Sequence, residues 1–205
     1  PIWGDVPGQL GFLSPEFLLM STLVPSSDRN VVAHVGCSVH GPWICGGAVR
    51  QWYEGESAGS DIDVFVRDEE QFDRLDRLFR EYGVEVANTK YAVTYNVLDV
   101  DRTVKYVQII KRHFDCIDDV FESFDLTCCQ IGFDGGSFVT RPNTIHDINH
   151  RIMSFVQLQP NVLKRYAKYN AYGFRLEDVD FFHKVVDNDQ VNWLFDPSED
   201  YAGVI

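Results

Sequence analysis

The stretch that decides the fold reads Ile44-Cys45-Gly46-Gly47-Ala48-Val49-Arg50 and, further on, Ser60-Asp61-Ile62-Asp63-Val64-Phe65. The first piece predicts an apolar strand end that turns through a glycine pair into a short helix, because glycine lets the backbone turn tightly. The second piece alternates polar and apolar residues at its start, which predicts a β-strand. Thirteen residues separate Gly47 from Asp61.

Asp61 and Asp63 are the first candidate functional residues. Side chains at positions i and i+2 of a strand point to the same face, so these carboxylates lie side by side. They repel each other unless a cation bridges them, and Mg²⁺ takes such oxygen ligands while keeping room for substrate phosphates. The alternative is an exposed strand face with solvated acids, opposite a buried face of Ile62, Val64 and Val66.

Gly46 and Gly47 are the second candidate feature. A glycine pair allows a ligand to approach the backbone closely, and free N–H groups at a helix start suit a phosphate. We expect the pair to hold a triphosphate, with Arg50 either pointing inward or solvated one turn into the helix. The alternative is that the two glycines only form a turn.

A third acid, Asp125, opens an apolar segment that predicts a strand over Asp125 to Phe133. It is the expected partner of Asp61 and Asp63. The alternative is a helix-to-strand junction with an exposed Asp125, and Asp99 and Asp101 compete for the same role.

Further elements are expected on both sides of this stretch. Turn residues and apolar periodicity predict strands at Val31–Val39, Val84–Ala87, Tyr91–Leu98 and Val104–Ile110, and helices at Pro15–Leu23, Asp68–Tyr82, Asp115–Phe124, Thr144–Leu158, Asn161–Tyr172 and Leu176–Val186. Gly83 is expected in the C′ position after the best helix. We therefore expect an α/β (α+β) fold in three parts: an irregular arm at 1–30, a catalytic domain at 31–140 with a mixed sheet flanked by helices, and a helical segment at 141–205.

Composition and charge narrow the classes of protein. The 205 residues are 45% hydrophobic and 24% charged, which is typical of a globular chain. A net charge of −13 disfavours non-specific binding to long nucleic acid or to an anionic membrane. Without a long apolar run or a good signal peptide, and with five unpatterned cysteines, we expect an intracellular protein with free thiols. Because the sequence starts at Pro1, we expect it to be trimmed or excised from a longer chain.

The pattern Ile44-Cys45-Gly46-Gly47 followed by Asp61-Ile62-Asp63 and a later acid resembles the nucleotidyltransferase superfamily of DNA polymerase beta, most closely its Gly-Gly branch with CCA-adding enzymes and poly(A) polymerases. The resemblance covers about residues 43 to 135. It implies a nucleotidyltransferase fold and a two-metal mechanism with Mg²⁺ or Mn²⁺. In that mechanism Asp61 and Asp63 bind both ions, Asp125 holds the ion nearest the acceptor hydroxyl, and Gly46, Gly47, Arg50 and Ser60 contact the NTP.

A second resemblance lies in Arg165-Tyr166-Ala167-Lys168-Tyr169, followed by Gly173-Phe174. It is similar to a segment after the catalytic domain of some viral and ankyrin-linked relatives, which suggests a viral or mobile-element origin. Arg165 and Lys168 lie three residues apart on a predicted helix, so both could grip a triphosphate. The alternative is a solvated basic face, and Tyr172 stands where the related pattern has Arg.

The sequence therefore predicts transfer of a nucleoside monophosphate from an NTP to a hydroxyl acceptor, with an RNA 3′ end favoured and a protein or small molecule as alternatives. A partner subunit could supply contacts to the acceptor, since the chain is short and acidic. The rival hypothesis is an inactive member of this fold that serves as a binding or scaffold module. His146 and His150 have the i, i+4 spacing of zinc ligands, but no third ligand is evident.

Overall fold

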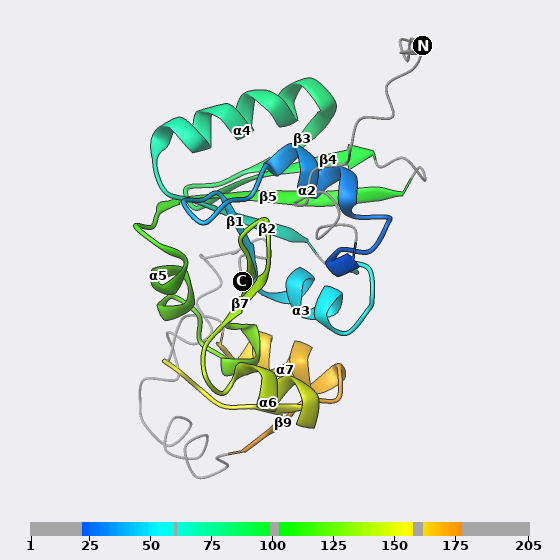
Figure 1. Cartoon of the computed structure of the whole chain (residues 1–205), viewed down its shortest axis with the longest axis vertical. Coiled ribbons are helices and arrows are strands. Elements are labelled where there is room, and N and C mark those ends of the chain that lie inside the picture. Colours follow the sequence, from blue (N-terminus) through cyan, green and yellow to red (C-terminus); the bar gives the residue numbers. More distant parts are fainter. Residues whose placement is uncertain (1–21, 60, 99–102, 158–161, 178–205) are drawn as a thin grey trace.

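The computed structural model describes residues 22–59, 61–98, 103–157 and 162–177, and a seven-stranded mixed sheet forms its centre (Figure 1). The strand order is β3-β4-β5-β2-β1-β6-β7. The bounds are β1 Trp43–Cys45, β2 Ile62–Val66, β3 Gly83–Asn88, β4 Ala92–Leu98, β5 Val104–His113, β6 Ile131–Phe133 and β7 Phe138–Thr140. The expected mixed sheet with flanking helices is confirmed, whereas the division into three parts at residues 30 and 140 stays a prediction.

Strand β2 lies in the middle of this sheet and carries Asp63, and Asp61 directly precedes the strand. It pairs in parallel with β5, so that Asp63 lies beside Gln108, and antiparallel with β1, so that Ile44 lies beside Val64. All five residues of β2 are buried, because the sheet is covered on both faces at this strand. The expected buried face of Ile62, Val64 and Val66 is confirmed, but the opposite face is buried as well.

Helix α4 (Glu69–Tyr82) lies across one face of β3, β4 and β5 (Figure 1). The Asp68 side chain caps its start by accepting a hydrogen bond from the Gln71 N–H. Leu75 and Phe79 are buried, and Phe79 stacks on Tyr95 of β4. The helix is the one the sequence predicted.

Gly83 ends α4 for a reason that differs from the expected left-handed cap. Its φ of −139° is extended, and it is already the first residue of β3. A Cβ at this position would lie 2.7 Å from the Asn96 carbonyl oxygen and 3.0 Å from that of Phe79. Close packing of two backbones, rather than a positive φ, therefore requires glycine here.

Helices α3 (Gly47–Tyr53), α5 (Ile117–Glu122), α6 (Thr144–His150) and α7 (Val162–Ala171) lie on the other side of the sheet, opposite α4 (Figure 1). The predicted long helix at Thr144–Leu158 is wrong, because the chain leaves α6 at Arg151, which has a φ of 53°, and enters β8 (Ile152–Met153). Strand β8 pairs in parallel with β9 (Arg175–Leu176). The helix predicted at Leu176–Val186 starts at a residue that belongs to β9 instead, and its residues from 178 onward lie outside the described residues.

Two predicted strands are also wrong. Val31 to Val39 contains helix α2 (Arg29–Val35), because Val31, Val32 and Val35 share one buried helix face and Gly36 closes it at a φ of 66°. Asp125 to Phe133 contains a 3-10 turn at Thr127–Cys129, and only Ile131–Phe133 joins the sheet. In both segments burial against neighbouring elements outweighs the strand preference of the residue types.

A buried polar network joins α2, α3 and β5. Asp28 is fully buried, and its carboxylate accepts hydrogen bonds from the Trp52 indole and the Ala58 N–H, each at 2.7 Å, while it pairs with the Lys105 ammonium at 2.7 Å. Every polar group of this cluster has a partner, so the network can be buried without a large cost.

In the described part of the chain, no helix is long and apolar enough to span a membrane.

Candidate active site

Gly46 stands at the turn between β1 and α3, next to the predicted acids. Its φ of 88° is one that side chains rarely adopt, and its N–H donates to the Ile131 carbonyl at 2.8 Å. The antiparallel register places Trp43 beside Phe65 and Ile44 beside Val64. The chain therefore reaches Gly46 next to the start of β2, where Ile62 follows Asp61. The glycine pair and the two acids therefore lie at one end of the same strand pair.

Asp63 is a buried carboxylate that lacks a full set of partners. It is 8% exposed, and its Oδ1 atom makes no hydrogen bond within the described structure. Burial raises the pKa of Asp63 well above its usual value, and the charge of Asp61 raises it further. Asp61 is less buried, and burial also raises its pKa. The two acids are therefore close enough for the charge of Asp61 to act on Asp63.

Lys168 of α7 supplies part of that positive charge. Its ammonium lowers the pKa of both Asp61 and Asp63, although burial outweighs this effect in each case. The predicted tail segment is therefore brought to the acid pair by helix α7. Lys168 itself is exposed, so it can move with little cost.

Arg165, one turn earlier on α7, pairs with the third predicted acid. Its Nε donates to Oδ2 of Asp125 at 2.5 Å, and the side chain of Asp125 is only 1% exposed. Oδ1 of Asp125 has no hydrogen-bond partner in the described structure. Burial raises the pKa of Asp125, and Arg165 partly offsets this rise.

Arg50 occupies an aromatic cage. Its guanidinium carbon lies 5.7, 5.6 and 5.4 Å from the ring centres of Tyr169, Tyr172 and Phe174, and the group forms an ion pair with Glu54. Contacts of this kind hold the end of α7 and the residues after it against α3. The predicted role of Arg50 in nucleotide binding stays a prediction.

The other predicted residues fall into two groups. Ser60, Asp99 and Asp101 lie outside the described residues. His146 and His150 stack on each other with ring centres 4.3 Å apart. Within the described ranges, no three His, Cys, Asp or Glu side chains are gathered closely enough to hold a metal ion together. Helix α7 thus connects the two groups of acids. Its Lys168 acts on Asp61 and Asp63, and its Arg165 pairs with Asp125.

A polar row beside Asp63 was missed at the sequence level. Gln108 of β5 lies next to Asp63 and is 1% exposed, and its Nε2 donates to the Thr94 hydroxyl of β4 at 3.1 Å. The three side chains share one face of three adjacent strands. Only the strand register reveals them, because Thr94 and Gln108 stand in otherwise ordinary strand segments.

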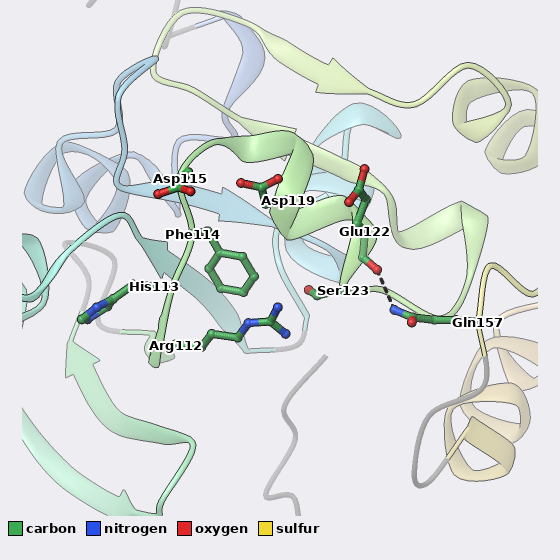
Figure 2. Close-up of a pocket in the computed structure, with 8 residues that line it drawn as sticks. All are labelled: Arg112, His113, Phe114, Asp115, Asp119, Glu122, Ser123 and Gln157. Atoms are coloured by element: carbon green, nitrogen blue, oxygen red, sulfur yellow. Dashed lines mark hydrogen bonds between the residues drawn. The ribbon is translucent and has the colours of Figure 1, made fainter.

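A cavity of about 560 Å³ lies near the C-terminal end of β5 (Figure 2). Its lining includes Arg112, Phe114 and Ser123, and the Gln157 amide donates to the Glu122 carbonyl at 2.6 Å on its rim. Because β2 and β5 are parallel and Asp63 pairs with Gln108, Arg112 lies four residues beyond the level of the acid pair. The cavity is therefore separate from the acids.

The fold and the site define a protein of the nucleotidyltransferase fold. A CCA-adding enzyme in complex with ATP superposes with a TM-score of 0.62 at 17% identity, over 86% of this chain and 45% of that chain. A complex with CTP gives 0.61 at 16%, over 82% and 45%. The Thermotoga maritima CCA-adding enzyme with tRNA gives 0.57 at 17%, over 80% and 43%. The chain thus spans less than half the length of these structures.

The chain belongs to the Gabija anti-defense 2 family, whose model matches residues 20–151, which is more than half of its length. The matched range contains the glycine pair, Asp61, Asp63 and Asp125. By comparison of sequences, no curated protein matches this chain.

Proposed function

We propose that this chain is a metal-dependent nucleotidyltransferase that transfers a nucleoside monophosphate from an NTP to a hydroxyl acceptor. The observation that carries the proposal is the buried Oδ1 atom of Asp63, which has no hydrogen-bond partner and lies at the strand end next to Gly46. A buried carboxylate oxygen without a partner is costly unless a cation completes it.

The residues fit a divalent cation. Asp61 and Asp63 supply oxygen ligands, and burial of both carboxylates, together with the charge of Asp61, raises the pKa of Asp63 and disfavours its ionised form when no cation is present. Asp125 offers a second partnerless buried oxygen on the side where α7 approaches. Mg²⁺ or Mn²⁺, when bound, would supply charge relief at the phosphorus and activate the acceptor hydroxyl.

The chain's own residues have distinct parts in this proposal. Gly46 and Gly47 leave room for the triphosphate close to the backbone. Lys168 stands beside the acids and is exposed, so it can turn from Asp61 and Asp63 to a phosphate. Asp125, once released from Arg165, is the candidate to accept the proton of the attacking hydroxyl.

The acceptor we favour is an RNA 3′ end, and a protein or a small molecule is the alternative. The similar structures are CCA-adding enzymes in complex with tRNA, CTP and ATP, which supports this order. The net charge of −13 supports the involvement of a partner subunit, because this chain offers little attraction to RNA by itself.

The family name adds a biological setting. We propose that the reaction serves to counter the Gabija defence that the name mentions. An anti-defence role fits the viral or mobile-element origin expected from the tail segment. In this setting the nucleotide is transferred to a component that the defence requires.

A gel assay tests the activity. The chain is incubated with each α-³²P-labelled NTP, Mg²⁺ or Mn²⁺, and total RNA, with purified Gabija proteins in a parallel tube. We expect label on RNA or on protein that depends on the metal and is absent with Asp63→Asn. Asp118→Asn is the matched control, because Asp118 is an exposed acid on α5 with 59% side-chain exposure. Equal labelling by Asp63→Asn, or no labelling under any condition, contradicts the proposal.

The second candidate is an inactive binding module of the same fold. The Asp125–Arg165 pair favours it, because an arginine there compensates the third acid without a metal. Binding of an NTP with Mg²⁺ but without labelled product would support this candidate.

A further inference from the structure

Strand β3 is an outer edge of the sheet. In the strand order it is paired only with β4, so within the described ranges no strand covers its other side. Its sequence, Gly-Val-Glu-Val-Ala-Asn, contains neither Lys nor Pro, the residues that commonly protect an edge strand. An edge of this kind is a template for another strand.

An exposed apolar patch adjoins this edge. Val84 is 67% exposed, Leu98 63%, Val104 51% and Tyr106 48%. The register aligns Val84 with Asn96, Asn96 with Tyr106, and Leu98 with Val104, so these side chains share one face of three adjacent strands. Tyr95 points to the other face, where it meets Phe79 of α4. We call this set, together with the exposed Val86 in the β3 bulge, the β3–β5 patch.

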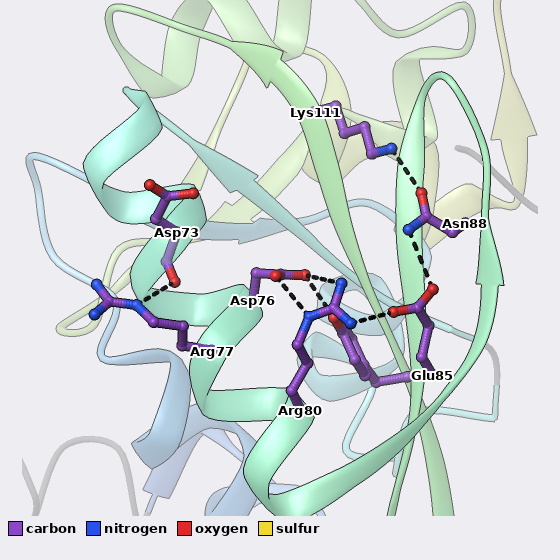
Figure 3. Close-up of polar contacts among 8 residues, drawn as sticks. Asp73, Asp76, Arg77, Arg80, Glu85, Asn88 and Lys111 are labelled. Carbon is purple, nitrogen blue, oxygen red and sulfur yellow. Dashed lines mark hydrogen bonds and ion pairs between the residues drawn. The ribbon is translucent and has the colours of Figure 1, made fainter.

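The edge is held in place by polar contacts. On the α4 side, Arg80 pairs with both Asp76 and Glu85 (Figure 3). Asn88 donates to Glu85 at 3.1 Å, and Lys111 of β5 donates to Asn88 at 2.7 Å. This chain of contacts fixes β3 before any partner arrives, which lowers the entropy cost of docking.

The patch lies on the same sheet face as the acid pair. Asp63, Gln108 and Thr94 form a row across β2, β5 and β4, and the patch continues on β5, β4 and β3. Since neighbouring strands are about 4.8 Å apart, β3 lies roughly 14 Å from β2. A protein on the patch would therefore reach towards Asp63.

We propose that the β3 edge and the β3–β5 patch dock a protein partner that adds a strand to β3, covers the patch with apolar side chains, and carries a basic surface around them. Basic residues on the partner would match the net charge of −13. The same charge opposes pairing with a second copy, because two copies repel each other. The patch contains neither Lys nor Arg, which disfavours a nucleic acid.

Val84→Lys tests the surface, because it places a charge in the patch and at the edge. Val39→Lys is the matched control, since Val39 has the same 67% exposure but lies outside the patch. The probe is the set of purified Gabija proteins, a choice that rests on the proposed anti-defence role. Binding to each immobilised variant is measured at two salt concentrations, and the mass of the chain alone is measured by light scattering.

We expect Val84→Lys to weaken binding at least tenfold, Val39→Lys to leave it unchanged, and the affinity of the wild type to fall as salt rises. Equal binding by Val84→Lys and the wild type overturns the proposal. A lack of any binding by the wild type also overturns it. So does a dimer of the wild-type chain alone that becomes a monomer in Val84→Lys. Asp63→Asn leaves this surface intact, so the labelling assay and the binding assay fail independently. Metal-dependent labelling together with equal binding by Val84→Lys and the wild type is a failure of the docking surface alone. Binding that Val84→Lys weakens, without any labelling, is a failure of the proposed transfer reaction alone.

Discussion

Arg165 and Asp125, 40 residues apart in the sequence, form an ion pair in which the side chains are 11% and 1% exposed. The pair ties α7 to the segment after α5. The same helix also carries Lys168, whose charge acts on Asp61 and Asp63. Helix α7 therefore brings two cations to the three acids of the proposed metal site.

Replacing one partner of this pair should be costly. Arg165→Met leaves Asp125 buried without its cation, and loss of one partner of a buried ion pair costs about 3–5 kcal/mol. We expect this loss in the free energy of urea unfolding, with a smaller loss in Arg165→Met combined with Asp125→Leu. Two single-variant losses that simply add up in the double variant would contradict the coupling.

The acid pair should make the metal-free protein less stable as the pH rises. The pKa values of Asp61 and Asp63 are raised in the folded state, so the folded protein binds more protons than the unfolded chain above the ordinary Asp value of 3.8. Stability therefore falls as the pH rises from there through the raised values. Without metal at pH 7, we expect Asp63→Asn to melt at a higher temperature than the wild type.

Bound metal should raise the melting temperature of the wild type above that of Asp63→Asn. At about 100 times its dissociation constant, a ligand stabilises a folded protein by roughly 2.7 kcal/mol, so Mn²⁺ should raise the melting temperature of the wild type by several degrees. Asp63→Asn should show almost no rise, and Asp118→Asn should behave as the wild type. An equal Mn²⁺ effect on all three proteins would place the metal elsewhere.

Gly46 and Gly55 allow strain to be separated from binding. Both have a positive φ, 88° and 79°, so alanine at either position should cost on the order of 1–2 kcal/mol of stability. Only Gly46 lies next to the acid pair. We expect Gly46→Ala to weaken Mg²⁺-dependent NTP binding at least tenfold in a calorimetric titration, while Gly55→Ala leaves it unchanged. Equal weakening in both variants would mean that the glycine pair only forms a turn.

Two measurements, hydrogen exchange in α7 and NTP binding, distinguish a structural role of Arg50 from a role in nucleotide binding. If its aromatic cage is structural, Arg50→Met should speed hydrogen exchange of the backbone amides of Val162–Ala171, because Tyr169 and Phe174 lose a contact. Exchange in α4 should stay the same. Weaker NTP binding with unchanged exchange in α7 would instead support the nucleotide contact that the sequence predicted.

The sequence allowed the central fold to be predicted because its signals are local. The glycine pair before a helix, the alternation around Asp61 and Asp63, and the apolar periodicity of the helix at Asp68–Tyr82 each depend on a few neighbouring residues. Val31–Val35 and Asp125–Gln130 were predicted wrongly, since their burial against distant elements overrides residue preference. The contacts of Arg50 and Arg165, like the position of Gln108 beside Asp63, depend on strand register and on the docking of α7, which no short pattern encodes.

The most direct measurement is the anomalous scattering of Mn²⁺ in a crystal of the chain with a non-hydrolysable NTP analogue. The account predicts a peak at about 2.1 Å from carboxylate oxygens of Asp61 and Asp63, with the triphosphate against Gly46 and Gly47. In Asp63→Asn crystals the peak should be lost. A nucleotide bound away from Gly46, or a wild-type crystal with no Mn²⁺ peak at the two acids, would contradict the assignment of a metal-dependent nucleotidyltransferase.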